Sequence, residues 1–211
     1  TGGICGSNNA FNGDIVINNC YSSGNIYGKY SGGICGNNFC ENNGKGIITN
    51  CYSLGTIGIL NSFKNGQGGI CGGYCGYLNS NINIKNSYSV GDLNSDNSGG
   101  IIGQHSGFRS LIDIDNCYST GSTNGLNANG IFGSNSGILG NLNITNSYSL
   151  DNFNNYNINN LIGNLGNVSS DIWIIVNNSY PILKAFRIGQ WNKNDYNKYD
   201  DKSKFKIFNK N

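Results

Sequence analysis

Cysteine is the residue type in this chain with the most varied potential chemistry, because thiolates act as nucleophiles, metal ligands and disulfide partners. The chain holds eight Cys, which fall into three sets by the short motifs around them. The first set lies within a GGICG motif, and later copies of this motif place Ile or Phe at the same position. Because a buried thiol behaves as a small apolar group, this exchange predicts a core position. The members of this set are Cys5, Cys35 and Cys71.

A second set of thiols stands immediately before a Tyr that recurs along the chain. Other copies carry Ser at this position, so the motif requires a small side chain rather than a thiol. We expect small, partly buried groups here and no ligand role. The members of this set are Cys20, Cys51 and Cys117.

The two remaining thiols, Cys40 and Cys75, each follow a GGICG motif by a few residues, in consecutive copies. If the copies stack, their backbones lie near the separation that a disulfide needs, and we predict a Cys40–Cys75 bond. Such a bond would indicate an oxidising compartment. The alternative is a zinc site that also uses Cys35 and Cys71. The core position predicted for those two favours the disulfide, so no metal is predicted.

Groups suited to acid–base catalysis are few. His105 is the only histidine, and it lies beside Ser106 without an evident orienting residue, so a plain turn role is favoured over a catalytic base. Asp113 and Asp115 are predicted on the outward face of one strand, where β-helical polysaccharide-cleaving enzymes place carboxylates. Other copies have Asn, Lys or Thr there, and Lys85 beside Asp115 indicates a surface ion pair. The sequence predicts no enzyme and no cofactor.

The elements that would position these groups come from an internal repeat. A GGI[CI]G-like motif alternates with a Tyr-centred motif such as IDIDNCYSTG, and copies recur about every 30 residues. The residues four and six before each Tyr are mostly Ile, with polar residues between them, which is the period-two pattern of a strand with one buried face. The recurring tyrosines are Tyr21, Tyr52, Tyr88, Tyr118, Tyr148 and Tyr180.

Units of this length predict an all-β fold, a single-stranded parallel β-helix (β-solenoid) of about six coils of ~30 residues. Its predicted extent is residues 1–183, and residues 184–211 are predicted to form a C-terminal capping or docking tail. A propeller is the weaker alternative, because each blade needs about 40–50 residues and four strands.

The residue two before each Tyr is Asn in every copy. In a stacked array these side chains would form a ladder of amide hydrogen bonds at a strand end, and we predict this structural role over ligand binding. The ladder residues are Asn19, Asn50, Asn86, Asn116, Asn146 and Asn178.

Composition restricts the function further. Charged residues are only 11% of the chain, and no run of about 18 apolar residues exists that could span a bilayer. The lysines of the tail are interleaved with aromatic residues, which favours partner docking over nucleic-acid binding in the absence of base-reading elements. Three sequons, at Asn143, Asn167 and Asn177, are possible glycosylation sites on a secreted route.

The pairing of GGI[CI]G with an NCYSTG-like strand resembles the GLUG repeats of bacterial surface proteins, including those beside M26 peptidases. The resemblance covers roughly Gly2–Leu183, and the segment Asp171–Phe186 looks like the ending of such arrays. The peptidase chemistry lies in a separate domain, so the resemblance implies an extracellular stalk or adhesive β-helix and no activity. The abundance of Asn, Ile, Lys and Tyr also suggests an AT-rich genome, as in giant viruses, some protists and low-GC bacteria.

We therefore predict a structural surface or fibre protein, a rigid rod for assembly or attachment at a cell or virion surface that forms homo-oligomers. The alternative is an adhesin that binds host glycans or a surface receptor through exposed aromatic and Asn side chains. A carbohydrate-active enzyme is the third hypothesis. Binding predicts exposed aromatics on one face, and catalysis predicts clustered carboxylates.

Overall fold

The computed structural model describes residues 1–62, 65–149, 173–174 and 182–183. Within these ranges every regular element is a strand or a bridge, and none is a helix. The chain divides into two compact units, Thr1–Asn154 and Asn155–Asn211. The first unit contains the first five copies of the repeat. The boundary predicted between residues 183 and 184 stays a prediction, because residue 184 lies outside the described residues.

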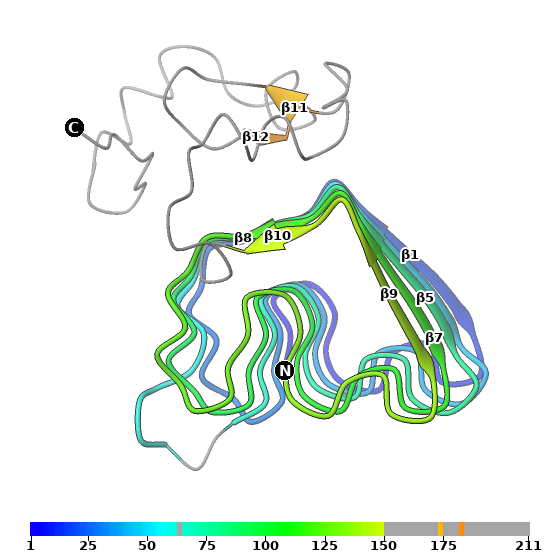
Figure 1. Cartoon of the computed structure of the whole chain (residues 1–211). Coiled ribbons are helices and arrows are strands. Elements are labelled where there is room, and N and C mark those ends of the chain that lie inside the picture. Colours follow the sequence, from blue (N-terminus) through cyan, green and yellow to red (C-terminus); the bar gives the residue numbers. More distant parts are fainter. Residues whose placement is uncertain (63–64, 150–172, 175–181, 184–211) are drawn as a thin grey trace. The chain divides into compact units, whose positions relative to one another are not determined.

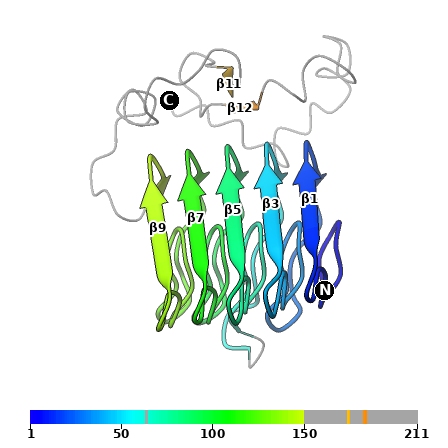
Figure 2. The same cartoon turned by 90° about the vertical axis from the view of Figure 1, so that its right-hand side faces the viewer.

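Five parallel strands form the longest face of the first unit, and Figure 2 shows them side by side. They pair in register, so that Ile17, Ile48 and Ile84 stand above one another. In Asn81–Lys85 the two Ile side chains are buried and the end residues are exposed, as the period-two pattern predicts. The strands are β1 (Asp14–Asn18), β3 (Lys45–Thr49), β5 (Asn81–Lys85), β7 (Leu111–Asp115) and β9 (Asn141–Thr145).

A short strand follows each long one after a sharp turn, and these strands form a second parallel sheet. The turn residue is Asn in all five coils, with φ between 45° and 55°, a left-handed conformation that Asn tolerates. The tyrosines of the short strands stack, with ring centroids 4.9 to 5.2 Å apart along the first four coils. The strands are β2 (Tyr21–Ser22), β4 (Tyr52–Ser53), β6 (Tyr88–Ser89), β8 (Tyr118–Ser119) and β10 (Tyr148–Ser149).

Single-residue bridges close each coil. The GGI segments pair from coil to coil, as in the Cys5–Cys35 and Cys35–Cys71 bridges. A further column of bridges joins Ile26, Ile57 and Leu93. Figure 1 views the stack along its axis, and the coils superimpose. The prediction of an all-β, parallel β-solenoid is confirmed.

The core is a column of apolar side chains inside the coils. Its centre consists of Ile from the long strands and Ile or Cys from the GGI segments, and these are completely buried from the second to the fourth coil. A smaller cluster of Ile26, Ile57 and Leu93 lies at another corner. No coil could bury these residues alone, so stability comes from stacking.

Among the described residues, the solenoid has fewer coils than the roughly six predicted. Five long strands stack in the first unit, connected by four turns of the chain. In the sixth copy, the described residues form β11 (Trp173–Ile174) and β12 (Ile182–Leu183), which pair antiparallel with each other. The second Gly of the GGI motif makes this stacking possible, because a Cβ added at Gly69 or Gly100 would overlap the next coil's carbonyl oxygen and a Ser side chain. The sixth copy departs from the motif at this position, where the sequence has Asn160.

Candidate binding surface

An outward turn follows each GGI segment and leads towards the next long strand. One position of this turn stacks through the coils, because in the first four coils its backbone N–H donates to a carbonyl of the next coil at 2.9–3.1 Å. All five residues have left-handed backbones, with φ between 52° and 60°. Three coils use Asn, which tolerates this conformation, whereas the third and fourth use Tyr and His. The column consists of Asn8, Asn38, Tyr74, His105 and Asn135.

Tyr74 is the centre of a group of five rings that we call the aromatic patch: Tyr30, Tyr74, Tyr77, His105 and Phe108. The Tyr74 and His105 rings stack with centroids 5.1 Å apart and a tilt of 23°. Tyr30 and Tyr77 meet Tyr74 edge-on at 5.1 and 5.5 Å, and Tyr77 stacks on Phe108 at 5.1 Å. All five rings are only partly buried, so the patch keeps an accessible surface.

The backbone of the neighbouring coil fixes Tyr30 in this patch. Its N–H donates to the carbonyl of Asn65 and its carbonyl accepts from the N–H of Gly73, each at 3.0 Å. A Cβ at Gly66 or Gly73 would overlap the Tyr30 ring, so Gly at these two positions creates the space in which the ring lies. The Tyr30 ring of the second coil therefore lies in a space that Gly66 and Gly73 of the third coil leave open.

Two cations lie at opposite ends of the patch. The Lys29 Nζ lies 4.8 Å from the centroid of the Tyr30 ring, and the Arg109 guanidinium lies 5.5 Å from that of Phe108. Both distances are in the range of cation–π attraction. One carboxylate residue is close, because Glu41 pairs with Tyr77 in an isolated bridge.

The ring of His105 is neutral at neutral pH. Partial burial lowers the pKa of His105 below its ordinary value of 6.5, and burial followed by the neighbouring Tyr30 raises the pKa of Tyr74. The patch therefore presents uncharged rings with hydrogen-bonding edges between two cations. Such a surface can stack on the apolar face of a flat or ring-shaped ligand and donate hydrogen bonds around it.

Sequence reasoning missed this patch. It treated His105 as a turn residue and did not compare the turn positions between coils. The sequence contains a pattern that predicts two of these contacts. Tyr74 and His105 both lie three residues after the fourth residue of the GGI[CI]G motif, and Tyr77 and Phe108 both lie six residues after it.

The predicted carboxylate residues lie on a different face of the solenoid. Asp113 accepts a hydrogen bond from Asn143 Nδ2 at 2.8 Å, and Asp115 accepts from Thr145 Oγ1 at 2.8 Å. Both border an open depression on strands β5, β7 and β9, to which Lys85 also contributes. Each carboxylate is thus engaged by a polar residue of the next coil. The sequence-based prediction that the chain is not an enzyme stays a prediction.

The predicted Asn ladder is hydrogen-bonded in its middle. Asn86 Nδ2 donates to Asn50 Oδ1 at 3.3 Å, and Asn116 Nδ2 donates to Asn86 Oδ1 at 2.6 Å. Towards the ends the amides turn to other partners, since Asn50 donates to Asn18 and Asn146 to Asp115. Asn19, the first predicted member, adopts the same left-handed turn. The last predicted member, Asn178, lies outside the described residues.

Cys40 and Cys75 are both free thiols, so the predicted disulfide is not formed. The reason is their register. Cys40 lies five residues after its GGI position and Cys75 four after its own, and the N–H of Gly76 bonds the carbonyl of Phe39 at 2.8 Å. Cys75 thus stands level with Phe39, and Cys40 with Gly76. Among the described residues, no group of three or more His, Cys, Asp or Glu could hold a metal ion.

One of the three predicted glycosylation sites can be placed. Asn143 is exposed on β9, where its amide donates to Asp113. Asn167 and Asn177 lie outside the described residues.

The fold and the patch define this protein as a β-solenoid with an aromatic surface on its turns. No protein-family model, curated protein or solved structure matches the chain. In the part of the chain that the structure describes, no helix has the length and apolar character needed to cross a membrane.

Proposed function

We propose that this protein is a rigid surface rod whose aromatic patch attaches it to carbohydrate. The observation that carries the proposal is the Tyr74–His105 stack in a column where the other coils have Asn. A left-handed backbone costs roughly 1–2 kcal/mol for residues other than Gly, Asn and Asp. Strained residues cluster at functional sites, which supports a role for these two rings beyond folding.

The packing of the patch is incomplete, which also supports binding. The rings stack on one another but stay partly exposed, whereas the tyrosines of the short-strand stack are buried from the second to the fourth coil. Rings that served only to stabilise the stack would gain most by full burial. The patch instead keeps ring faces and polar edges accessible to a ligand.

Carbohydrate fits this surface better than nucleic acid does. A pyranose ring combines an apolar face, which stacks on an aromatic ring, with hydroxyl groups that bond to polar edges. The patch extends over three coils, roughly 10 Å at about 4.8 Å per coil, which suits a short oligosaccharide. Nucleic-acid binding depends on a track of cations for phosphates, and here Lys29 and Arg109 stand at the two ends with Glu41 close by.

The test is binding of the full chain to an array of neutral and acidic oligosaccharides, followed by titration calorimetry with the strongest ligand. The decisive variant is Tyr74→Asn combined with His105→Asn. Both changes restore the residue that the other coils use, so the fold should be kept or stabilised. We expect at least a tenfold loss of affinity.

Phe11→Asn is the matched control. Phe11 occupies the same turn position as Tyr77 and Phe108, is 55% exposed, and lies in the first coil away from the patch. It should bind like the parent chain. The proposal is wrong if the parent chain binds no oligosaccharide, or if the double variant binds as tightly as the parent.

A second candidate role is assembly through the first coil. Ile4, Phe11 and Val16 are apolar residues of the first coil and are 49%, 55% and 68% exposed. We propose that another copy of the chain packs against the first coil and forms a homo-oligomer. Ile4→Lys should lower the mass that light scattering detects at high concentration, whereas Leu139→Lys, an exposed residue of the fifth coil, should not. An unchanged mass across concentrations in the parent chain would contradict assembly.

The proposed location is extracellular, at a cell or virion surface. The resemblance of the repeat to GLUG arrays supports it. A surface location would also expose the aromatic patch to glycans, as attachment requires.

A further inference from the structure

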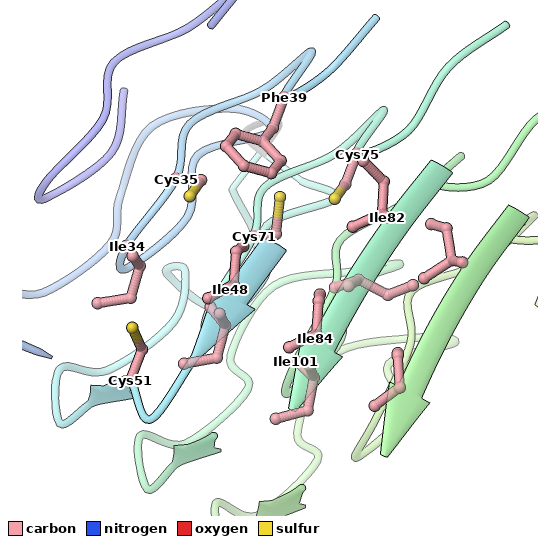
Figure 3. Close-up of a cluster of buried hydrophobic side chains, with 14 of the residues drawn as sticks. Ile34, Cys35, Phe39, Ile48, Cys51, Cys71, Cys75, Ile82, Ile84 and Ile101 are labelled. Carbon is pink, nitrogen blue, oxygen red and sulfur yellow. The ribbon is translucent and has the colours of Figure 1, made fainter. Parts of the chain in front are cut away.

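Five thiols gather along one side of the core in the first three coils. Cys5, Cys35 and Cys71 form a column through the GGI bridges, and Cys40 and Cys75 lie beside it. Figure 3 shows Cys35, Cys71 and Cys75 close to Phe39 in the core. The attachment role proposed above uses none of these groups.

Cys5 and Cys35 are direct neighbours in this column. They pair in an isolated parallel bridge. In it the Cys5 N–H donates to the backbone carbonyl of Ile34 at 2.9 Å, and the Gly36 N–H donates to the backbone carbonyl of Cys5 at 3.0 Å. In such a bridge the two side chains extend to the same face, so the Cys5 and Cys35 thiols are neighbours across the first two coils.

The hydrogen bonds along the column favour negative charge at Cys5. The bond from Cys35 lowers the pKa of the Cys5 thiol to about 7, although burial opposes this. Burial followed by the bond to Cys5 raises the pKa of Cys35, and burial also raises that of Cys71. The thiolate is therefore favoured at Cys5, at the end of the column.

Solvent also reaches Cys5 more readily than the other thiols of the cluster. Cys5 is partly exposed in the first coil, whereas Cys35, Cys40, Cys71 and Cys75 are completely buried. In a chain whose first coil is not covered by another copy, a dissolved oxidant can therefore reach Cys5 before the other members of the cluster. Reactive thiols are those that combine exposure with thiolate character.

We propose that Cys5 and Cys35 form an oxidation site, at which a peroxide converts the two thiols into a disulfide between the first and second coils. The Cys5 thiolate attacks one oxygen of hydrogen peroxide, which breaks the O–O bond, releases hydroxide and leaves a sulfenic acid on Cys5. The Cys35 sulfur then attacks the Cys5 sulfur, the S–OH bond breaks, and water is released with the proton of Cys35. Two thiols are oxidised while one peroxide is reduced to two waters.

The fold permits this bond with a small movement. Adjacent strands lie about 4.8 Å apart, within the Cα range of disulfides, whereas the Cβ atoms of a disulfide lie about 3.5–4.5 Å apart. The two coils must therefore approach by roughly 1 Å at this point.

Cys20 and Cys51 provide a comparison within the same two coils. They are also hydrogen-bonded neighbours, but each thiol donates to a backbone carbonyl, Cys20 to Asn18 at 3.4 Å and Cys51 to Thr49 at 3.2 Å. Burial raises the pKa of Cys51 to about 12. This second pair should therefore oxidise after the first.

The experiment is a titration of the reduced full chain with hydrogen peroxide. Remaining thiols are alkylated, and the disulfides are mapped by mass spectrometry. Cleavage at Asp14, Lys29 and Lys45 separates Cys5 from Cys20 and from the fragment with Cys35, and fragmentation distinguishes Cys35 from Cys40. We expect Cys5–Cys35 as the first disulfide. A Cys20–Cys51 or Cys40–Cys75 bond that forms earlier would overturn the proposal.

Two variants and one rate measurement sharpen the result. Cys35→Ala should abolish the first disulfide and leave Cys5 as a sulfenic or sulfinic acid, whereas Cys51→Ser, a residue that other coils use at that position, should leave it intact. In the parent chain the alkylation rate of Cys5 should rise with a midpoint near pH 7, with Cys35 and Cys40 as its titratable neighbours. Equal alkylation rates for Cys5 and Cys20 at pH 7 would contradict the site even if Cys35→Ala failed to fold.

Discussion

The first coil and the third coil carry nearly the same motif in different surroundings. Cys5 in GGICG is partly exposed with a pKa near 7, and Cys71 in the same motif is completely buried with a raised pKa. In the short strands, Tyr21 is 41% exposed and Tyr88 is 6% exposed. The difference arises because an inner coil has neighbours on both sides. In a solenoid, the position of a coil in the stack decides how its residues behave, as much as their type does.

The final Gly of the GGI[CI]G motif should show the difference between an inner coil and the first coil most strongly when it is replaced by Ala. A Cβ at Gly103 in the fourth coil would overlap backbone atoms of Gly66, Gly72 and Gly73, whereas a Cβ at Gly6 in the first coil would meet no atom within 4 Å. We expect Gly103→Ala to lower the free energy of unfolding by more than about 4 kcal/mol, and Gly6→Ala to change it by less than about 0.5 kcal/mol. Urea unfolding measures both. Similar losses for the two variants would break the comparison.

Core truncation should produce the next largest contrast. Ile82 in β5 is completely buried, and Ile15 stands in the same column of β1 but is only partly buried. Ile82→Ala should cost about 3 kcal/mol of unfolding free energy, and Ile15→Ala about 1 kcal/mol, because less surface is removed from the core. Thermal and urea denaturation report the values. An equal loss at both sites would show that the first coil is covered in solution.

Alkaline pH should affect the inner thiols and the end thiol in opposite directions. Burial raises the pKa of Cys51 and of Cys117 to about 12, so above pH 9 the unfolded chain releases their protons first and stability falls between pH 9 and 12. The lowered pKa of Cys5 stabilises the fold above pH 9, and this contribution disappears as the pH falls through 7.

The measurement is the urea midpoint of the reduced protein between pH 8 and 11. We expect it to fall with rising pH in the parent chain and to fall less in Cys117→Ser, which introduces the residue of the adjacent coils. An equal slope in both proteins would exclude Cys117 as a cause.

The smallest expected effect concerns the Ser residues of the short strands. The Ser89 hydroxyl is buried without a hydrogen-bond partner and lies against Gly69. Ser89→Ala removes a buried, unsatisfied hydroxyl and should leave stability unchanged or raise it by up to about 1 kcal/mol. In the first coil the partly exposed Ser22 should tolerate the same change without any gain. A loss above about 1 kcal/mol in Ser89→Ala would indicate a partner for this hydroxyl.

The repeat alone was sufficient to predict the fold, because in-register stacking follows from period-two Ile and recurring Gly. Among the described residues five coils stack rather than the six predicted, and β11 and β12 of the sixth copy pair with each other instead. The Asn residues were recognised from their spacing, but the partners at the ladder ends depend on which side chains, such as Asn18 and Asp115, reach the same turn.

The thiols and the aromatic patch show where sequence reasoning stops. Cys40 and Cys75 are at similar but unequal distances from their motifs, and one residue of offset decides which side chains stand level. For the patch, the Tyr30–Tyr74 contact crosses from the second coil to the third, and Tyr30 also lies against Gly66 and Gly73. These neighbours of Tyr30 stand at unequal distances from the repeated motifs, so they are found only in three dimensions.

The left-handed turn column has a consequence for how such a surface can evolve. In the genetic code the two Asn codons differ from the two His codons and from the two Tyr codons in the first base alone. Any coil with Asn at this position is therefore a single base substitution away from presenting an imidazole or a phenol on the outer face. The stack tolerates such a change because the next coil still supplies the backbone hydrogen bonds that hold the turn. Each added coil thus offers another position at which a new recognition surface can arise without a new fold.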